Sequence, residues 1–181
     1  MKRIALFALL LFALLAAAEA QPKRARGRAG SIREADQKTV DAAQVPEAVR
    51  QAQNVAFPGL SVTRWEQRSG KNNQQNFTHY VAVFKQDSRT TRARYDSNGK
   101  SLAVTKFFTA NDAPQVVTSA AARYTGYSFV GGEEVLTDKG TFYRARFRQG
   151  AKKLTVFLDQ TGAAVEKKNQ PKLLDIKDEG N

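Results

Sequence analysis

Few side chains in this sequence have the types and the spacing that catalysis requires. The chain has a single histidine, His79, and no cysteine, and it contains neither the Gly-x-Ser-x-Gly nor the His-Glu-x-x-His pattern of hydrolases. Glu133 and Glu134 are adjacent, so on a strand they point to opposite faces and cannot work as an acid and base pair. Asp96 and Asp159 each begin an Asp-x-x-Gly turn that lacks the further carboxylates of a calcium loop. We therefore expect no catalytic, metal-binding or cofactor-binding residue and no enzyme activity.

A better candidate for function is a set of arginines that recur at two-residue spacing. Arg92 and Arg94 form one pair, and Arg144 and Arg146 form the other. This spacing places each pair on one face of a strand, where guanidinium groups can orient a partner and apolar neighbours can supply area that loses water on contact. The alternative is an ordinary solvated sheet face, and nucleic acid is a weaker candidate because stacking aromatics are few. The candidate partner-binding residues are Val81, Val83, Arg92, Arg94, Arg144, Arg146 and Phe157.

The elements that must position these residues occur twice. The segment Tyr80–Phe84 is followed by the turn Asp96–Gly99, and 63 residues later Tyr143–Phe147 is followed by the turn Asp159–Gly162. Such self-similarity indicates an internal duplication. An aspartate that caps its own turn and a glycine free to take positive φ are typical of tight hairpins, so each turn should join two antiparallel strands.

Each copy begins with a helix and continues with strands. The first helix starts at Val45-Pro46, because proline fits the first helical position, and Phe57-Pro58-Gly59 ends it. The second helix follows Ala113-Pro114 and ends at Thr125-Gly126. Alternating segments then predict strands at about 60–67, 77–86, 89–96, 101–108, 127–135, 141–148, 152–159 and 163–167. The predicted fold class is α+β, with two tandem units that each pack one helix on a four-stranded antiparallel sheet.

The alternation also assigns the two faces of the predicted sheet. Tyr80, Ala82 and Phe84 share one side, which we expect to pack beneath the helix. The other side carries the arginines and is expected to be open, mixed and basic, with His79 exposed on it. Trp65, the only tryptophan, has two interpretations, core packing or a surface anchor for a partner.

The N-terminus has the pattern of a secretory signal peptide. Lys2 and Arg3 precede an apolar run that ends in Ala18-Glu19-Ala20, and the run is too short and too poorly flanked for a membrane-spanning helix. Cleavage after Ala20 would export the chain to the periplasm or the medium, without a lipid anchor or disulfides because cysteine is absent. The net charge is +12, or +11 once this peptide is removed. The expected organisation is a signal peptide at 1–20, a basic linker at 21–44 with a short helical stretch near 34–43, unit 1 at 45–110, unit 2 at 111–168 and a charged tail at 169–181.

The order of these features resembles the PepSY-like, β-lactamase-inhibitor-like family of exported bacterial proteins. The resemblance rests on the proline-led helix, the Phe57-Pro58-Gly59 stop, the strand that carries Trp65 and the Asp96–Gly99 turn, and it covers about 45–167. It implies tandem units of one helix and four strands, export, and a non-catalytic role in which the exposed, concave face of the sheet binds an enzyme.

The expected function is that of an exported, non-catalytic binding or inhibitory module that engages a protein partner, for example a hydrolase or a peptidase, through the open sheet face. Charge reversal at Arg144 and Arg146 should then abolish binding and leave the fold intact. The alternative is a structural or polyanion-binding protein of the envelope, which would attach to an anionic envelope polymer through its net charge and the stretch Lys23–Arg28. Salt separates the two, because modest added salt weakens polyanion binding steeply.

Overall fold

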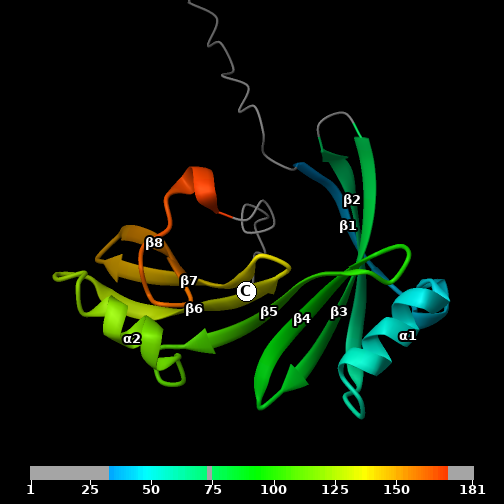
Figure 1. The fold of residues 1–181 in the computed structure, drawn as a ribbon, viewed down its shortest axis with the longest axis horizontal. Helices are drawn as coiled ribbons and strands as arrows, with labels where there is room; N and C mark the ends of the chain where they lie inside the picture. Colours follow the sequence, from blue (N-terminus) through cyan, green and yellow to red (C-terminus); the bar gives the residue numbers. More distant parts are fainter. Residues whose placement is uncertain (1–32, 73–74, 171–181) are drawn as a thin grey trace, which may run out of the picture.

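The computed structural model describes residues 33–72 and 75–170, which form one antiparallel sheet with two α-helices. Each strand pairs with the next strand in sequence, so the eight strands lie side by side in the order β1 to β8 (Figure 1). The helices are α1 (Glu47–Ala56) and α2 (Gln115–Ala121), with short 3-10 helices η1 (Ala42–Gln44) and η2 (Lys167–Asn169). The strands are β1 (Arg33–Val40), β2 (Val62–Asn72), β3 (Gln75–Gln86), β4 (Arg89–Asp96), β5 (Ser101–Thr109), β6 (Ser128–Thr137), β7 (Gly140–Gln149) and β8 (Lys152–Asp159). The predicted α+β class is confirmed.

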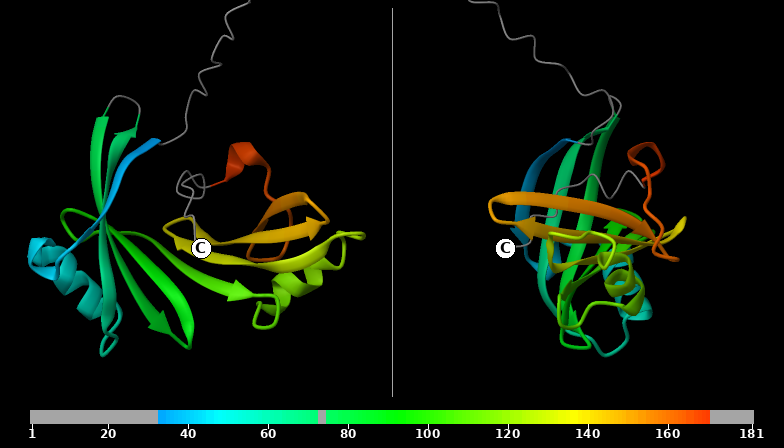
Figure 2. Two further views of the ribbon diagram at one scale, coloured as in Figure 1. Left: turned by 180° about the vertical axis from the view of Figure 1, so that it is seen from behind. Right: turned by 90° about the vertical axis from the view of Figure 1, so that its left-hand side faces the viewer.

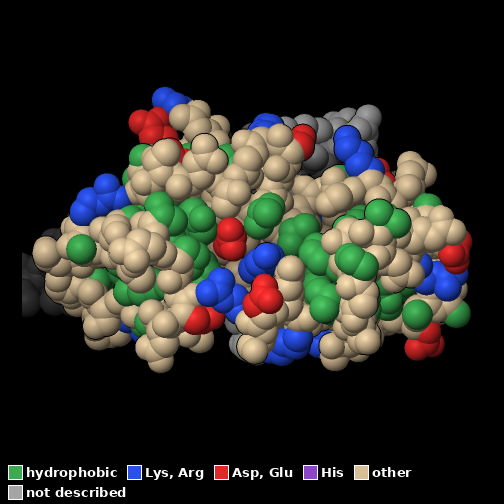
Figure 3. All heavy atoms as spheres, turned by 60° about the horizontal axis from the view of Figure 1, so that its bottom comes forward, with side chains coloured by type: hydrophobic (Ala, Val, Ile, Leu, Met, Phe, Trp, Pro, Cys, Tyr) green, Lys and Arg blue, Asp and Glu red, His purple; other side chains and the backbone are tan. Residues whose placement is uncertain are grey.

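The sheet is bent, and both helices lie on the outer side of the bend (Figures 1 and 2). α1 covers the half that contains β2 to β4, and α2 covers the half that contains β6 to β8. On the side shown in Figure 3, hydrophobic side chains gather in two areas that are separated by charged side chains of both signs. Beneath the surface, one hydrophobic core lies under each helix.

The first core forms where α1 packs on β2, β3 and β4. Val49 of the helix is fully buried against Ala82 and Phe84, which lie on the side of the sheet that the alternation predicted. Trp65 belongs to this core, so packing is the correct one of its two interpretations. The second core has the same plan, with Val117 and Ala120 of α2 packed on Tyr143, Ala145, Phe147 and Leu158.

The turn between β4 and β5 connects the sheet to α1. The Asp96 carboxylate accepts hydrogen bonds at Oδ1 from the backbone N–H groups of Asn98 (2.9 Å) and Lys100 (3.0 Å). This turn places Gly99, with φ of +83°, directly against the helix, where a Cβ atom would lie 2.5 Å from the carbonyl oxygen of Ala48. Only glycine fits both the backbone angle and the contact.

The turn after β8 repeats this arrangement beneath α2. Asp159 Oδ1 accepts hydrogen bonds from the backbone N–H groups of Thr161 (2.8 Å) and Ala163 (3.0 Å). Gly162, with φ of +82°, lies against Val116 of α2, and a Cβ atom there would be 3.0 Å from Val116 Cγ2. The two halves thus dock their helices through corresponding turns.

The stretch expected to be a linker contains a strand. Residues Arg33–Val40 form β1 at the edge of the sheet, paired with β2, so the prediction of a linker over 21–44 and of a helical stretch near 34–43 is wrong here. Val40 is buried opposite Trp65, whereas residues 37–39 are exposed. Backbone hydrogen bonds to β2 form this strand, and most of its described side chains are not buried. Its sequence therefore needs no alternating apolar pattern.

The predicted strand at 163–167 is also wrong. Ala164 forms a single bridge to Leu158 of β8, and the Val165 N–H donates to the Phe157 carbonyl at 2.8 Å. η2 then follows on the side of the sheet opposite α2 (Figures 1 and 2). The second half therefore contributes three strands, and β1 brings the sheet to eight. The other seven predicted strands lie where the alternation placed them, with ends that differ by a few residues.

Several predicted segments lie outside the described residues. These are the signal peptide at 1–20, the basic stretch Lys23–Arg28 and the part of the charged tail at 171–181. A search of the described helices for a segment that could cross a membrane found none of sufficient length and apolar character.

Candidate functional site on the concave face of the sheet

The side of the sheet that faces away from the helices gathers most of the charged strand residues. We call it the concave face because it lies inside the bend (Figure 2). By strand register its charged residues are Arg64, Glu66, Arg68, Lys85, Arg92, Arg94, Glu133, Arg144, Arg146, Arg148 and Lys153. Its apolar residues are Phe77, Val81, Val83, Ala103, Phe107, Val135, Phe142 and Phe157. Asp96 and Asp159 lie at the margin of this face and accept hydrogen bonds from the backbone amides of their own turns. Even with these two aspartates included, cations outnumber carboxylates on the concave face.

All seven predicted partner-binding residues lie on the concave face. The register places Val81 opposite Arg94, Val83 opposite Arg92 and Phe157 opposite Arg144. The expectation that this face is open is wrong for its middle, because Val81, Val83 and Arg94 are only 1%, 7% and 5% exposed. Val81 lies between Glu66 and Arg94 in the sheet, and Val83 lies between Arg64 and Arg92, so long charged side chains flank both valines. Arg92, Arg144 and Phe157 are partly exposed, and the Arg146 side chain is 40% exposed.

Glu66 is the centre of a buried ion network in the first half of the face. Its Oε1 accepts hydrogen bonds from Arg64 Nε (3.0 Å) and Nη2 (2.7 Å), and its Oε2 accepts from Arg68 Nη2 (3.0 Å) and Gln37 Nε2 (3.2 Å). Burial alone would raise the pKa of Glu66, but the hydrogen bonds from Arg64 and Arg68 and the charges of Arg68 and Arg92 hold this pKa below its ordinary value. The glutamate therefore stays ionised and fixes two guanidinium groups in place.

Glu133 has the same role in the second half. Its buried carboxylate pairs with Arg144 of β7, and Arg146 Nη2 lies 3.6 Å from its Oε1. The register puts Glu133 on the concave face and Glu134 on the helix side, so the two adjacent glutamates do point apart. From the sequence, Glu133 was considered only as a candidate acid. Its role as the partner of Arg144 depends on strand register, which the sequence does not specify.

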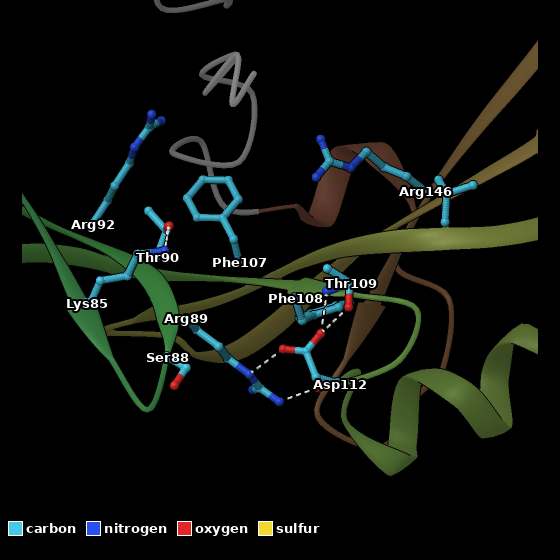
Figure 4. A pocket seen from close by; sticks show the side chains of 11 residues that line it. Lys85, Ser88, Arg89, Thr90, Arg92, Phe107, Phe108, Thr109, Asp112 and Arg146 are labelled. Atoms are coloured by element: carbon cyan, nitrogen blue, oxygen red, sulfur yellow. Dashed lines mark hydrogen bonds and ion pairs between the residues drawn. The ribbon is translucent and has the colours of Figure 1, made fainter.

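A cavity of about 410 Å³ lies at one end of the concave face, beside the β3–β4 hairpin. The guanidinium carbon of Arg92 is 5.1 Å from the centre of the Phe107 ring, within cation–π range. Arg89 closes the outer side through a hydrogen bond from its Nε to Asp112 Oδ2 at 2.9 Å. Arg92, Phe107 and Arg146 all point to the same side in Figure 4. Phe107 was not among the predicted residues, although alternation from Ala103 would have placed it on this face.

His79 is half-buried on the concave face instead of exposed as predicted. It lies opposite Arg68 of β2 and Asp96 of β4. Burial and the charges of Arg94 and Arg68 lower the pKa of His79 to about 4, and the opposing effect of Asp96 is smaller than their sum. The imidazole is therefore neutral near pH 7 and adds no charge to the arginines around it.

We expect the ring protons of His79 to titrate with a midpoint near pH 4. In the unfolded chain the imidazole takes up a proton near its ordinary pKa of 6.5. The group therefore contributes stability that is present above pH 6.5 and is lost as the pH falls from 6.5 towards 4. Proton NMR measures this directly, because the chain has a single histidine. A midpoint near 6.5 would show that the ring is solvated.

The concave face offers cations and apolar area. Among the residues that the structure describes, no cluster of three or more histidine, cysteine, aspartate or glutamate side chains could hold a metal ion. The arrangement suits the binding of carboxylates, because fixed guanidinium groups present paired donors to planar acidic groups.

Comparisons with known proteins identify the fold. No protein-family model matches the sequence, and no curated protein matches it. A DUF2874 family protein from Bacteroides uniformis has a TM-score of 0.54 at 18% identity, over 67% of this chain and 86% of that chain. A BLIP-like protein from Bacteroides fragilis has a TM-score of 0.52 at 18% identity, over 67% of this chain and 84% of that chain. The fold is BLIP-like.

A third structure has the same BLIP-like fold. It is a protein from Bacteroides eggerthii whose name assigns it provisionally to the periplasm, with a TM-score of 0.52 at 14% identity, over 67% of this chain and 86% of that chain. Identities this low show the fold alone. The resemblance drawn from the sequence is thus supported as a BLIP-like fold, and its PepSY component stays a prediction.

Proposed function

We propose that this BLIP-like protein is an exported, non-catalytic binding module whose concave face engages an acidic surface on a protein partner. The observation that carries the proposal is the excess of arginines on a face where two buried glutamates, Glu66 and Glu133, already fix four of them. Guanidinium groups that are held in place lose less conformational freedom when they bind a carboxylate, and they define the orientation of the partner.

The mechanism would be occlusion of the partner by contact with the concave face. Arg146, Arg92 and Phe157 retain exposed area and would contact the partner first. The buried residues Val81, Val83 and Arg94 would support that surface from below. A hydrolase or peptidase whose active site has an acidic rim is a suitable partner, because the half-buried rings of Phe142 and Phe157, which pack on the buried Ala103 and Val135, could cover its centre.

We also propose that the chain is a duplication and that it is exported. The corresponding docking of Gly99 on α1 and Gly162 on α2 supports two units, with the first extended to include β1. The pattern of the first 20 residues and a fold shared with a protein assigned provisionally to the periplasm support export and cleavage after Ala20.

The structure changes the choice of test variant. Arg144 contacts the buried carboxylate of Glu133, so reversal of Arg144 would place two carboxylates together and destabilise the fold. Lys85 and Lys153 are exposed at two places on the concave face, and both are better probes. Lys38 and Lys100 are exposed on other surfaces and give a control with the same change in charge.

We expect the Lys85→Glu, Lys153→Glu variant to lose about tenfold or more in affinity for a protein captured by the native chain. The Lys38→Glu, Lys100→Glu variant should keep its affinity. Each captured protein would be purified and its binding measured by calorimetry at low and moderate salt. Equal affinities for the two variants would rule out the concave face as the binding surface.

The high net charge also favours the second candidate function, polyanion binding in the envelope. The same experiment separates the two. Retention that both variants reduce equally, and that moderate salt abolishes, would identify binding to an anionic polymer by net charge.

A further inference from the structure

The C-terminal residues 171–181 have a chemistry that complements the concave face. Asp175, Asp178 and Glu179 give the last seven residues a net negative charge, although the whole chain is strongly basic. Leu173 and Leu174 come directly before these acids, Ile176 lies between Asp175 and Asp178, and Lys172 and Lys177 are the only bases of the segment. The concave face offers the matching groups, namely an excess of arginines and an apolar cluster.

The chain leads into this segment from the concave side. Val165 is tied to β8 by its hydrogen bond to the Phe157 carbonyl, and Gln170 Nε2 donates to the Val165 carbonyl at 3.2 Å. The intervening η2 lies on the side of the sheet opposite α2 (Figures 1 and 2). Gln170 is therefore linked through Val165 to Phe157, which belongs to the apolar cluster with Ala103, Val135 and Phe142.

The segment is long enough to cross the face. Eleven residues follow Gln170, and an extended chain of that length spans about 36 Å. Neighbouring strands are about 4.8 Å apart, so β4 with its arginines lies only about 19 Å from β8 across the sheet. Both the apolar cluster and Arg92 are within reach.

We propose that residues 171–181 dock on the concave face of their own chain. Leu173, Leu174 and Ile176 cover the apolar cluster, and the three acids bind the arginines of β4 and β7. If the concave face also binds a protein partner, as proposed above, residues 171–181 compete with that partner for the face, and the partner displaces them. This competitor role rests on the proposed function. It also indicates the chemistry of that partner, an acidic segment with interspersed aliphatic residues.

The test uses the full mature chain and a synthetic peptide with the sequence of residues 171–181. In the Asp175→Lys, Asp178→Lys, Glu179→Lys variant the charge of the tethered segment no longer complements the concave face. The labelled peptide should therefore bind to the face of this variant, and moderate salt should lower its affinity. The wild-type chain should bind the peptide at least about tenfold more weakly, because a tethered competitor acts at an effective concentration in the millimolar range. Fluorescence anisotropy gives both affinities.

A control variant carries the same charge change at exposed acids away from η2, Asp41→Lys, Glu47→Lys, Asp138→Lys, and should behave like the wild type. Peptide binding that is absent from all three proteins, or equal in all three, would overturn the proposal. The assay contains no external partner, so its failure leaves the proposed function untouched. A docked segment without any captured partner would refute the proposed function instead.

Discussion

Replacement of Glu66 by glutamine is expected to lower the free energy of unfolding by about 3 kcal/mol at neutral pH. The carboxylate is 2% exposed and accepts hydrogen bonds from Arg68, which is 1% exposed, and from Arg64. Loss of its charge leaves the buried guanidinium group of Arg68 with less compensation, which is the costly outcome for a buried ion pair. Arg64 is 45% exposed, so water screens its share, and the effect should lie at the lower end of the range for buried pairs.

The effect of this substitution should depend on pH. Because the pKa of Glu66 is depressed in the folded protein, its contribution is fully present above the ordinary value of 4.5 and is lost as the pH falls through the folded value. Urea unfolding of the wild type and of Glu66→Gln should therefore give curves that differ at pH 7 and converge in acid. Glu166→Gln, at an exposed site, serves as the control and should change stability little. Equal effects at the two sites would contradict the buried network.

The second large effect is expected at Gly99. Replacement by alanine should lower the free energy of unfolding by more than about 2 kcal/mol, because a left-handed backbone alone costs about 1–2 kcal/mol in an alanine. The added Cβ would also meet the Ala48 carbonyl oxygen at 2.5 Å and push α1 away from the sheet. Thermal unfolding followed by circular dichroism measures the change.

Two other glycines separate the causes of this effect. Gly59 has φ of +76°, and a Cβ atom there would have no neighbour within 4 Å, so Gly59→Ala reports backbone strain alone. Gly162→Ala should fall between the two, since its nearest contact is the Val116 side chain at 3.0 Å, which can move. If Gly99→Ala and Gly59→Ala have equal effects, the contact between the turn and α1 does not stabilise the fold.

Local signals explain why most of the fold could be predicted. Proline and glycine mark both ends of α1 and the start of α2, and period-two alternation marks the seven strands from β2 to β8. The prediction missed β1 because its pairing with β2 is long-range and Val40 is the one core residue among its described side chains, so this polar edge strand carries no alternating pattern. The strand expected at 163–167 has too few backbone partners and forms a single bridge.

The sequence predicted that the seven candidate residues share one face of the sheet, but it did not predict how exposed that face is. Alternation placed Val81 and the arginines on one face correctly, since the side-chain period of a strand is fixed. The burial of Val81 has no local signal, because the neighbours that flank it, Glu66 and Arg94, come from other strands. The ion network of Glu66 did have a local signal in the sequence, because the pattern Arg64-x-Glu66-x-Arg68 places an acid between two bases on the same side of a strand. Glu133 had none, since its partner Arg144 comes from another strand.

The order of the strands has a consequence for how the molecule assembles. Every strand pairs only with its neighbours in sequence, so no pairing must wait for a distant part of the chain to arrive. Topologies with such short loop closures fold faster than those that join remote segments. Assembly can start at any hairpin and spread outward one strand at a time, and each half gains its own core when its helix docks. A chain without cysteine and with this strand order needs no oxidant and no search among crossovers to fold, and its N-terminal half can be complete before its C-terminal half has folded.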